Sequence, residues 1–178
     1  MTLIVETGAS VLGAESYAAI ATIDAYWLAR PQIAQAAIWA AATTAVKEGA
    51  AREATAFLDA TYGPSYKGQR RGYIQGRLWP RSNALDEAGY PLPDLPPELI
   101  EATCELAGRA VSARLATDAA VDGVVKRTKK QVGPISTEVE YGDGAGRFAR
   151  FGAIDGLLAP LLDTTPSGGA GGNHWSWA

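Results

Sequence analysis

The sequence is poor in the residues from which catalytic and metal sites are commonly built. Its 178 residues include one histidine, His174, and one cysteine, Cys104. A single cysteine cannot form an internal disulfide, and a nucleophile–base pair would have to use a histidine in a Gly-rich terminal segment. We therefore interpret Cys104 as a small buried thiol. We expect no catalytic residue, metal ligand or cofactor, and thus a protein that is not an enzyme.

The chain also lacks a basic excess and a long apolar run. Sixteen Lys and Arg residues against nineteen Asp and Glu residues give a net charge of −3. This balance argues against nucleic-acid binding over a broad surface, but it is compatible with a local basic patch. The most apolar stretch, 33–46, is too short and too mixed to span a bilayer, and the first ten residues do not resemble a signal peptide. These features predict a soluble protein made inside the cell.

Two long segments show the apolar spacing of amphipathic helices. In 45–62 the apolar residues, beginning with Val46, recur about every 3.6 positions, with Thr43 or Thr44 as the N-cap. In 98–116 an Ala/Leu stripe follows Pro96-Pro97, and proline suits the first helical turn.

A shorter helical pattern surrounds Trp27, and Ser16 or Thr22 could be the N-cap of that helix. A second short helical pattern surrounds Trp39, whose side chain we expect to be buried. Another short apolar helix is predicted for 154–162.

In 124–141 the spacing of apolar residues changes from the helical period to the period of a strand. Residues 135–141 alternate between apolar and polar side chains, which is typical of a strand. Residues 124–132 are the candidate partner strand. A turn at Gly133-Pro134 would place Lys129 opposite Glu138 and Arg127 opposite Glu140. The fold class is therefore mainly α, with a β-hairpin and a flexible C-terminal tail.

Basic residues gather in two places, the central loop 66–96 and the hairpin. Both clusters can be ordinary solvated charge, or they can contact DNA phosphates or a neighbouring subunit. Aromatic residues interleave the loop cluster, as in single-strand binders, although we interpret Trp79 as a core residue. The candidate contact residues are Arg70, Arg71, Lys126, Arg127, Lys129 and Lys130.

The tail, 164–178, is rich in Gly and Ser and carries two tryptophans, Trp175 and Trp177, beside His174. Tryptophan is a favoured interface anchor, so these three residues are candidates for docking in a partner's groove. The alternative is a terminus without fixed structure. We divide the chain into one domain, 1–163, and this tail.

The chain carries a family resemblance over nearly its whole length, to about Leu162, and its most specific pieces lie in the segments LWPRSNALDEAGYPLP (78–93) and VVKRTKKQVGPISTEVEY (124–141). They resemble a bacteriophage family called DnaT-like single-stranded-DNA-binding. The same pattern is similar to the head-to-tail adaptor (connector) proteins of long-tailed phages and gene-transfer agents. That resemblance implies a mainly α fold, a helical bundle with a protruding β-hairpin, in which the helices 45–62 and 98–116 would form the bundle core. It also implies a ring, usually of twelve copies, that sits beneath the portal in the virion neck and extends the DNA channel.

Our first hypothesis is such an adaptor ring, made in the host cytoplasm and joining the portal to the next neck protein. The tail would reach the portal, and the basic hairpin would line the lumen, where packaged DNA passes, or a subunit seam. The alternative is a single-stranded-DNA-binding accessory protein of phage replication.

Overall fold

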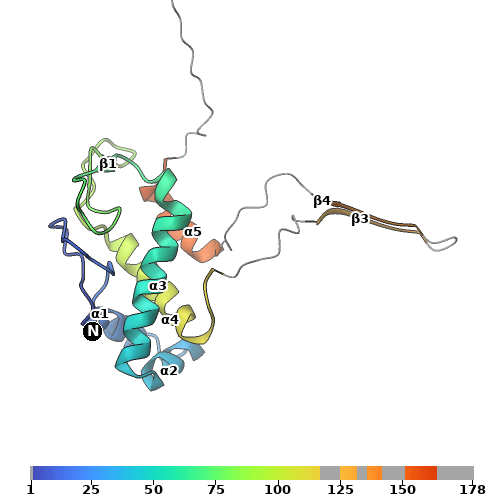
Figure 1. The fold of residues 1–178 in the computed structure, drawn as a ribbon, viewed down its shortest axis with the longest axis horizontal. Coiled ribbons are helices and arrows are strands. Elements are labelled where there is room, and N and C mark those ends of the chain that lie inside the picture. The colour runs from blue at the N-terminus through green and yellow to red at the C-terminus, as the bar shows by residue number, and fades with distance from the viewer. Residues whose placement is uncertain (1, 117–124, 132–135, 142–150, 164–178) are drawn as a thin grey trace, which may run out of the picture.

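The computed structural model describes residues 2–116, 125–131, 136–141 and 151–163 and confirms a mainly α-helical fold with a β-hairpin (Figure 1). None of the described helices is long and apolar enough to cross a membrane. The helices are α1 (Ile20–Leu28), α2 (Ala34–Ala41), α3 (Thr44–Tyr62), α4 (Pro97–Ser112) and α5 (Gly152–Leu158), with 3-10 turns η1 (Gly63–Ser65) and η2 (Ala159–Leu161). Two antiparallel pairs complete the fold: β1 (Gln69–Arg70) with β2 (Arg81–Ser82), and β3 (Val125–Gln131) with β4 (Ser136–Tyr141).

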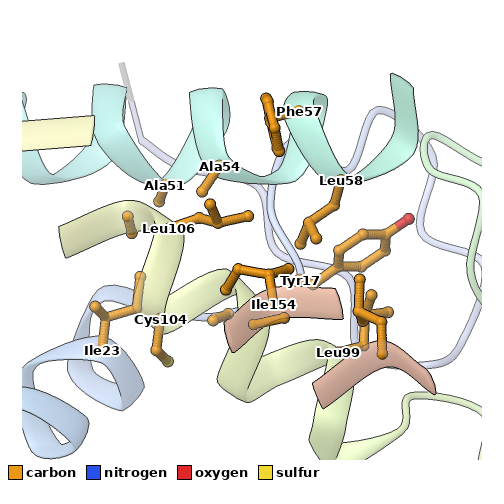
Figure 2. Packing of buried hydrophobic residues seen from close by; sticks show 14 of the residues in the cluster. Tyr17, Ile23, Ala51, Ala54, Phe57, Leu58, Leu99, Cys104, Leu106 and Ile154 are labelled. Carbon is orange, nitrogen blue, oxygen red and sulfur yellow. The ribbon is translucent and has the colours of Figure 1, made fainter. Parts of the chain in front are cut away.

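The core lies between α3 and α4 and is closed by α5 (Figure 2). Small side chains on α3, such as Ala51 and Ala54, face larger ones such as Leu106 on α4, which allows the helices to pack closely. Most residues of the predicted stripes are buried, while Ala110 and Val111 of α4 are partly buried. Val46 is 45% exposed, because the buried face of α3 begins one turn later, at Ala50.

Three helix boundaries test the predicted caps and stops. Thr43 is confirmed as the N-cap of α3, since its hydroxyl accepts a hydrogen bond from the Val46 N–H. Neither Ser16 nor Thr22 caps α1, because its N-cap position is Ala19 and the Ser16 hydroxyl donates instead to the Ala18 carbonyl.

Helix α4 ends at Ser112, before the predicted 116. The chain turns extended at Ala113, and the Leu115 N–H then donates to the Glu53 carboxylate of α3 at 2.7 Å. This bend buries the Leu115 side chain against the bundle.

Helix α1 packs on α4 at a glycine. A Cβ atom on Gly108 would lie 2.3 Å from Cζ2 of Trp27, so only glycine lets the indole ring approach the helix this closely. The Trp27 indole N–H donates to the carbonyl of Cys104 at 3.2 Å, which fixes the ring. Trp27 and Trp39 are both buried, as predicted for Trp39.

The central loop, 66–96, is folded rather than structureless. It contains the β1–β2 pair and a cis peptide bond between Trp79 and Pro80. Trp79 is fully buried, which confirms its interpretation as a core residue. The loop lies at the end of α3 opposite to α2 (Figure 1). It packs on the N-terminal arm, residues 2–19.

Candidate nucleic-acid interface

The β3–β4 ribbon pairs in the register that the sequence predicts. Arg127 lies opposite Glu140 and Lys129 lies opposite Glu138. A register irregularity between Val125 and Arg127 leaves Lys126 outside the regular pairing of the two strands. The ribbon lies apart from the helices, so its two strands are placed to contact something other than the bundle (Figure 1). The predicted Gly133-Pro134 turn lies outside the described residues.

The register divides the cations of the ribbon into two groups. Arg127 and Lys129 each have a glutamate directly across, and such cross-strand pairs partly neutralise one another. Lys130 lies opposite Thr137, and Lys126 has no partner in the strand register. The two described strands hold four cations and two carboxylates, in a chain whose net charge is −3. The ribbon is therefore a locally basic element on an acidic protein.

The loop candidates, Arg70 and Arg71, are occupied by contacts within the chain. The Arg70 guanidinium donates to the Gln75 carbonyl at 2.8 Å. Arg71 donates to the Gly8 carbonyl at 3.2 Å and forms an ion pair with Asp94, whose pKa is lowered mainly by the hydrogen bond from this guanidinium. Both arginines reach solvent, but their donors hold the loop together. Arg70 and Arg71 therefore lie on a different element from the four ribbon cations.

Two further arginines, Arg77 and Arg81, shape the loop, a role that was not predicted from the sequence. Arg81 donates to the carbonyls of Tyr66, Lys67 and Gly68 at 2.6–3.2 Å. Arg77 reaches the N-terminal arm and donates to two carbonyls there at 2.8 and 2.9 Å. A guanidinium group carries five N–H donors in a fixed fork. Four arginines in a Pro/Gly-rich loop therefore indicate that their side chains could hydrogen-bond backbone carbonyl groups and hold the loop in shape.

A buried tyrosine seats the loop on α3. The Tyr17 hydroxyl accepts the N–H groups of Leu78 and Trp79 at 3.1 and 3.2 Å and donates to the Asp59 carboxylate. Burial, helped by the neighbouring carboxylate, raises the pKa of Tyr17, so it remains a donor at neutral pH. Burial also raises the pKa of Asp59, and this effect exceeds the lowering by the hydrogen bond from Tyr17 and by the charge of Arg77. The arm, the loop and α3 thus meet at one hydroxyl.

His174, Trp175 and Trp177 lie outside the described residues. Cys104 is buried, as predicted, and burial raises the pKa of its thiol to about 12. Within residues 2–116, 125–131, 136–141 and 151–163, no group of three or more His, Cys, Asp or Glu side chains could hold a metal ion.

The described residues form a small, mainly α-helical protein that carries a basic two-stranded ribbon, β3–β4. A family model for DnaT-like ssDNA binding proteins matches residues 1–175. This match covers nearly the whole chain, and the protein belongs to that family. No curated protein and no solved structure matches the chain. The family fits the second hypothesis, single-stranded-DNA binding, better than the adaptor hypothesis, which it does not support.

Proposed function

We propose that the protein binds single-stranded DNA and that the β3–β4 ribbon makes the phosphate contacts. The observation that carries this proposal is the strand register, which leaves Lys126 and Lys130 without a carboxylate directly opposite in the described strands. Membership of a DnaT-like ssDNA binding family supports the same function. The arginines of the central loop are secondary candidates, because their donors already bind carbonyl groups or Asp94.

The dimensions of the ribbon suit a short stretch of single strand. The seven residues of β3 extend over about 23 Å. An isolated two-stranded hairpin is marginally stable in water, so a ligand that lies along it would also stabilise it. With two to four cations in contact with phosphates, the affinity should be modest and should fall as salt is added.

The test is a titration of a fluorescein-labelled oligothymidine with the full-length protein at low salt. Binding should be saturable, and the Lys129→Glu, Lys130→Glu variant should weaken it at least tenfold, because two cations become anions on the proposed contact surface. The Arg70→Gln, Arg71→Gln variant should change it less. A flat titration for the unmodified protein at low salt would rule out this function.

A second candidate is the head-to-tail adaptor ring. One observation favours it: the ribbon lies apart from the helices, as an element that inserts between neighbouring subunits would (Figure 1). In this proposal several copies, twelve by the resemblance, form a ring at the virion neck. The ring contacts the portal and the next neck protein, packaged DNA passes through the lumen, and the protein has no enzymatic activity.

Electron microscopy of the protein mixed with its portal tests the adaptor proposal. A ring bound to the portal is the expected result. Removal of 165–178 should preserve the helical circular-dichroism signal and weaken portal binding. Particles that stay single beside the portal would exclude the adaptor and leave the DNA-binding proposal standing.

A further inference from the structure

The surface between α1 and α2 is hollowed into an apolar groove far from the ribbon and from the central loop. It has a volume of about 600 Å³, within the range of about 300–1,000 Å³ that is usual for ligand sites. Trp27, Leu28, Pro31, Ala37, Trp39 and Lys47 line it. Leu28 is 83% exposed and lines the groove beside two buried tryptophans, Trp27 and Trp39. Nothing in the proposed function uses this groove.

The groove also has a polar edge, made by Asp24. Its Oδ1 atom accepts hydrogen bonds from the Lys47 ammonium and from the Trp39 indole N–H, both at 2.7 Å. Among the described residues these bonds use one carboxylate oxygen, so Oδ2 remains an acceptor beside an apolar surface. A matching occupant is a large aromatic ring with one N–H donor, and indole has this chemistry because it donates and does not accept.

The chain itself carries two such groups on a Gly-rich linker, Trp175 and Trp177. The last described residue, Asp163, is fixed by a hydrogen bond from its N–H to the carbonyl of Ser65 at 2.8 Å. Ser65 follows the C-terminal end of α3, whereas Lys47 in the groove lies in the first turn of α3. The linker therefore starts at the end of α3 opposite to the groove.

Distances decide whether the groove belongs to the same chain or to a neighbour. From Lys47 to the end of α3 the helix rises about 23 Å, and a chain must also pass around the bundle. The twelve residues from 164 to Trp175 have a root-mean-square span of about 19 Å if they behave as a Gly-rich linker. Reaching its own groove would require the linker to extend beyond its root-mean-square span and to pass around the bundle. Docking in a second copy requires no such path and costs the entropy of association instead.

We infer that the Trp175–Trp177 segment of one copy docks in the α1–α2 groove of a second copy. The two surfaces differ, so the contact is head-to-tail. Such contacts build closed rings when the rotation between copies closes and open chains when it does not. The contact uses neither the ribbon nor the central loop, so self-association and DNA binding are separable.

A peptide covering 164–178, labelled at its first residue, tests the docking. It is titrated into the full-length Trp175→Ala, Trp177→Ala variant, whose groove is free of competing tryptophan. Saturable binding is expected. Adding Ala37→Arg, which fills the groove from an exposed position, should weaken binding at least tenfold. The matched control, Ala153→Arg at an exposed position of α5, should change it less than twofold. No binding, or equal loss in both arginine variants, overturns the inference.

A mixing experiment decides between neighbour and self. The unmodified protein should form concentration-dependent oligomers in analytical ultracentrifugation. The variant without the tryptophans and the Ala37→Arg variant should each be monomeric, and their mixture should give a dimer, since one intact tail meets one intact groove. If the Ala37→Arg variant is poorly folded, Leu28→Ser takes its place and should likewise be monomeric alone and form a dimer in the mixture. A monomeric unmodified protein, or a mixture that stays monomeric, overturns the docking between copies.

Discussion

The strand register makes a quantitative prediction about salt. For single strands, the slope of log affinity against log salt is about −0.7 for each phosphate contact. If Lys126 and Lys130 are the cations free to bind, the slope is about −1.4, and affinity falls about sevenfold between about 50 and about 200 mM salt. The Lys130→Gln variant should halve the slope, so that the same change of salt costs less than about threefold.

The opposite change should strengthen the dependence. Glu138→Gln, Glu140→Gln removes the carboxylates across from Lys129 and Arg127, which makes four cations available. The slope should then approach −2.8, and the same change of salt should cost about fiftyfold. Affinity at low salt should rise at the same time, since two negative charges leave the surface.

Fluorescence anisotropy with a labelled oligothymidine at four salt concentrations measures these slopes on the full chain. Arg114→Gln is the matched control, because Arg114 is an exposed cation of the helical body rather than of the ribbon. Its slope should equal that of the unmodified protein. An unchanged slope for Lys130→Gln, or a slope for Glu138→Gln, Glu140→Gln that does not steepen, would refute the assignment of contacts from the register.

The remaining predictions concern the helical body, and chemical denaturation followed by circular dichroism measures each of them. Gly108→Ala should lower the free energy of unfolding by about 1–3 kcal/mol because the new Cβ atom meets the Trp27 ring. Gly49→Ala, with open space around the new Cβ atom, should raise the free energy of unfolding by about 0.5–1 kcal/mol. Equal effects of the two substitutions would contradict the close packing of Gly108 against Trp27. Tyr17→Phe should lower the free energy of unfolding by about 1–3 kcal/mol, since the buried N–H of Trp79 and the part-buried N–H of Leu78 lose their acceptor. A neutral result would mean that the loop does not depend on this hydroxyl. Burial alone would raise the pKa of Asp24, but hydrogen bonds from Lys47 and a tryptophan lower it overall. A carboxyl group whose pKa is lower in the folded state stabilises above its unfolded pKa, about 3.9, and loses that contribution as pH falls through the folded value. Asp24→Asn should therefore flatten the loss of stability in acid, and an identical pH profile would show that the pair with Lys47 contributes nothing.

Regular patterns in the sequence predicted the regular elements. Helices α3 and α4 are long enough for the 3.6-residue period to be clear, and Thr43 has the local chemistry of a cap. The hairpin register followed from alternation and from opposite charges at matching positions. These features depend on neighbours along the chain or across one turn, which is why they can be read without a structure.

Features set by distant contacts were not predictable in this way. Helix α4 stops early because Leu115 meets Glu53 of another helix. The order of the central loop has no local pattern in the sequence, because it comes from arginines that bind carbonyl groups, some of them more than sixty residues away. Of the candidate contact residues, Arg70 and Arg71 gave no sign in the sequence that their donors were engaged, and the α1–α2 groove has no sequence pattern at all.

The way in which Arg77 and Arg81 hold the central loop has a consequence for its response to acidity. Their acceptors are mostly backbone carbonyls, which gain no proton as acid is added, and a guanidinium group loses none in the range where proteins are folded. Ion pairs such as Arg71 with Asp94 dissolve when the carboxylate is neutralised, but these ties do not. The loop should therefore keep its form through swings of acidity that release the charged contacts around it.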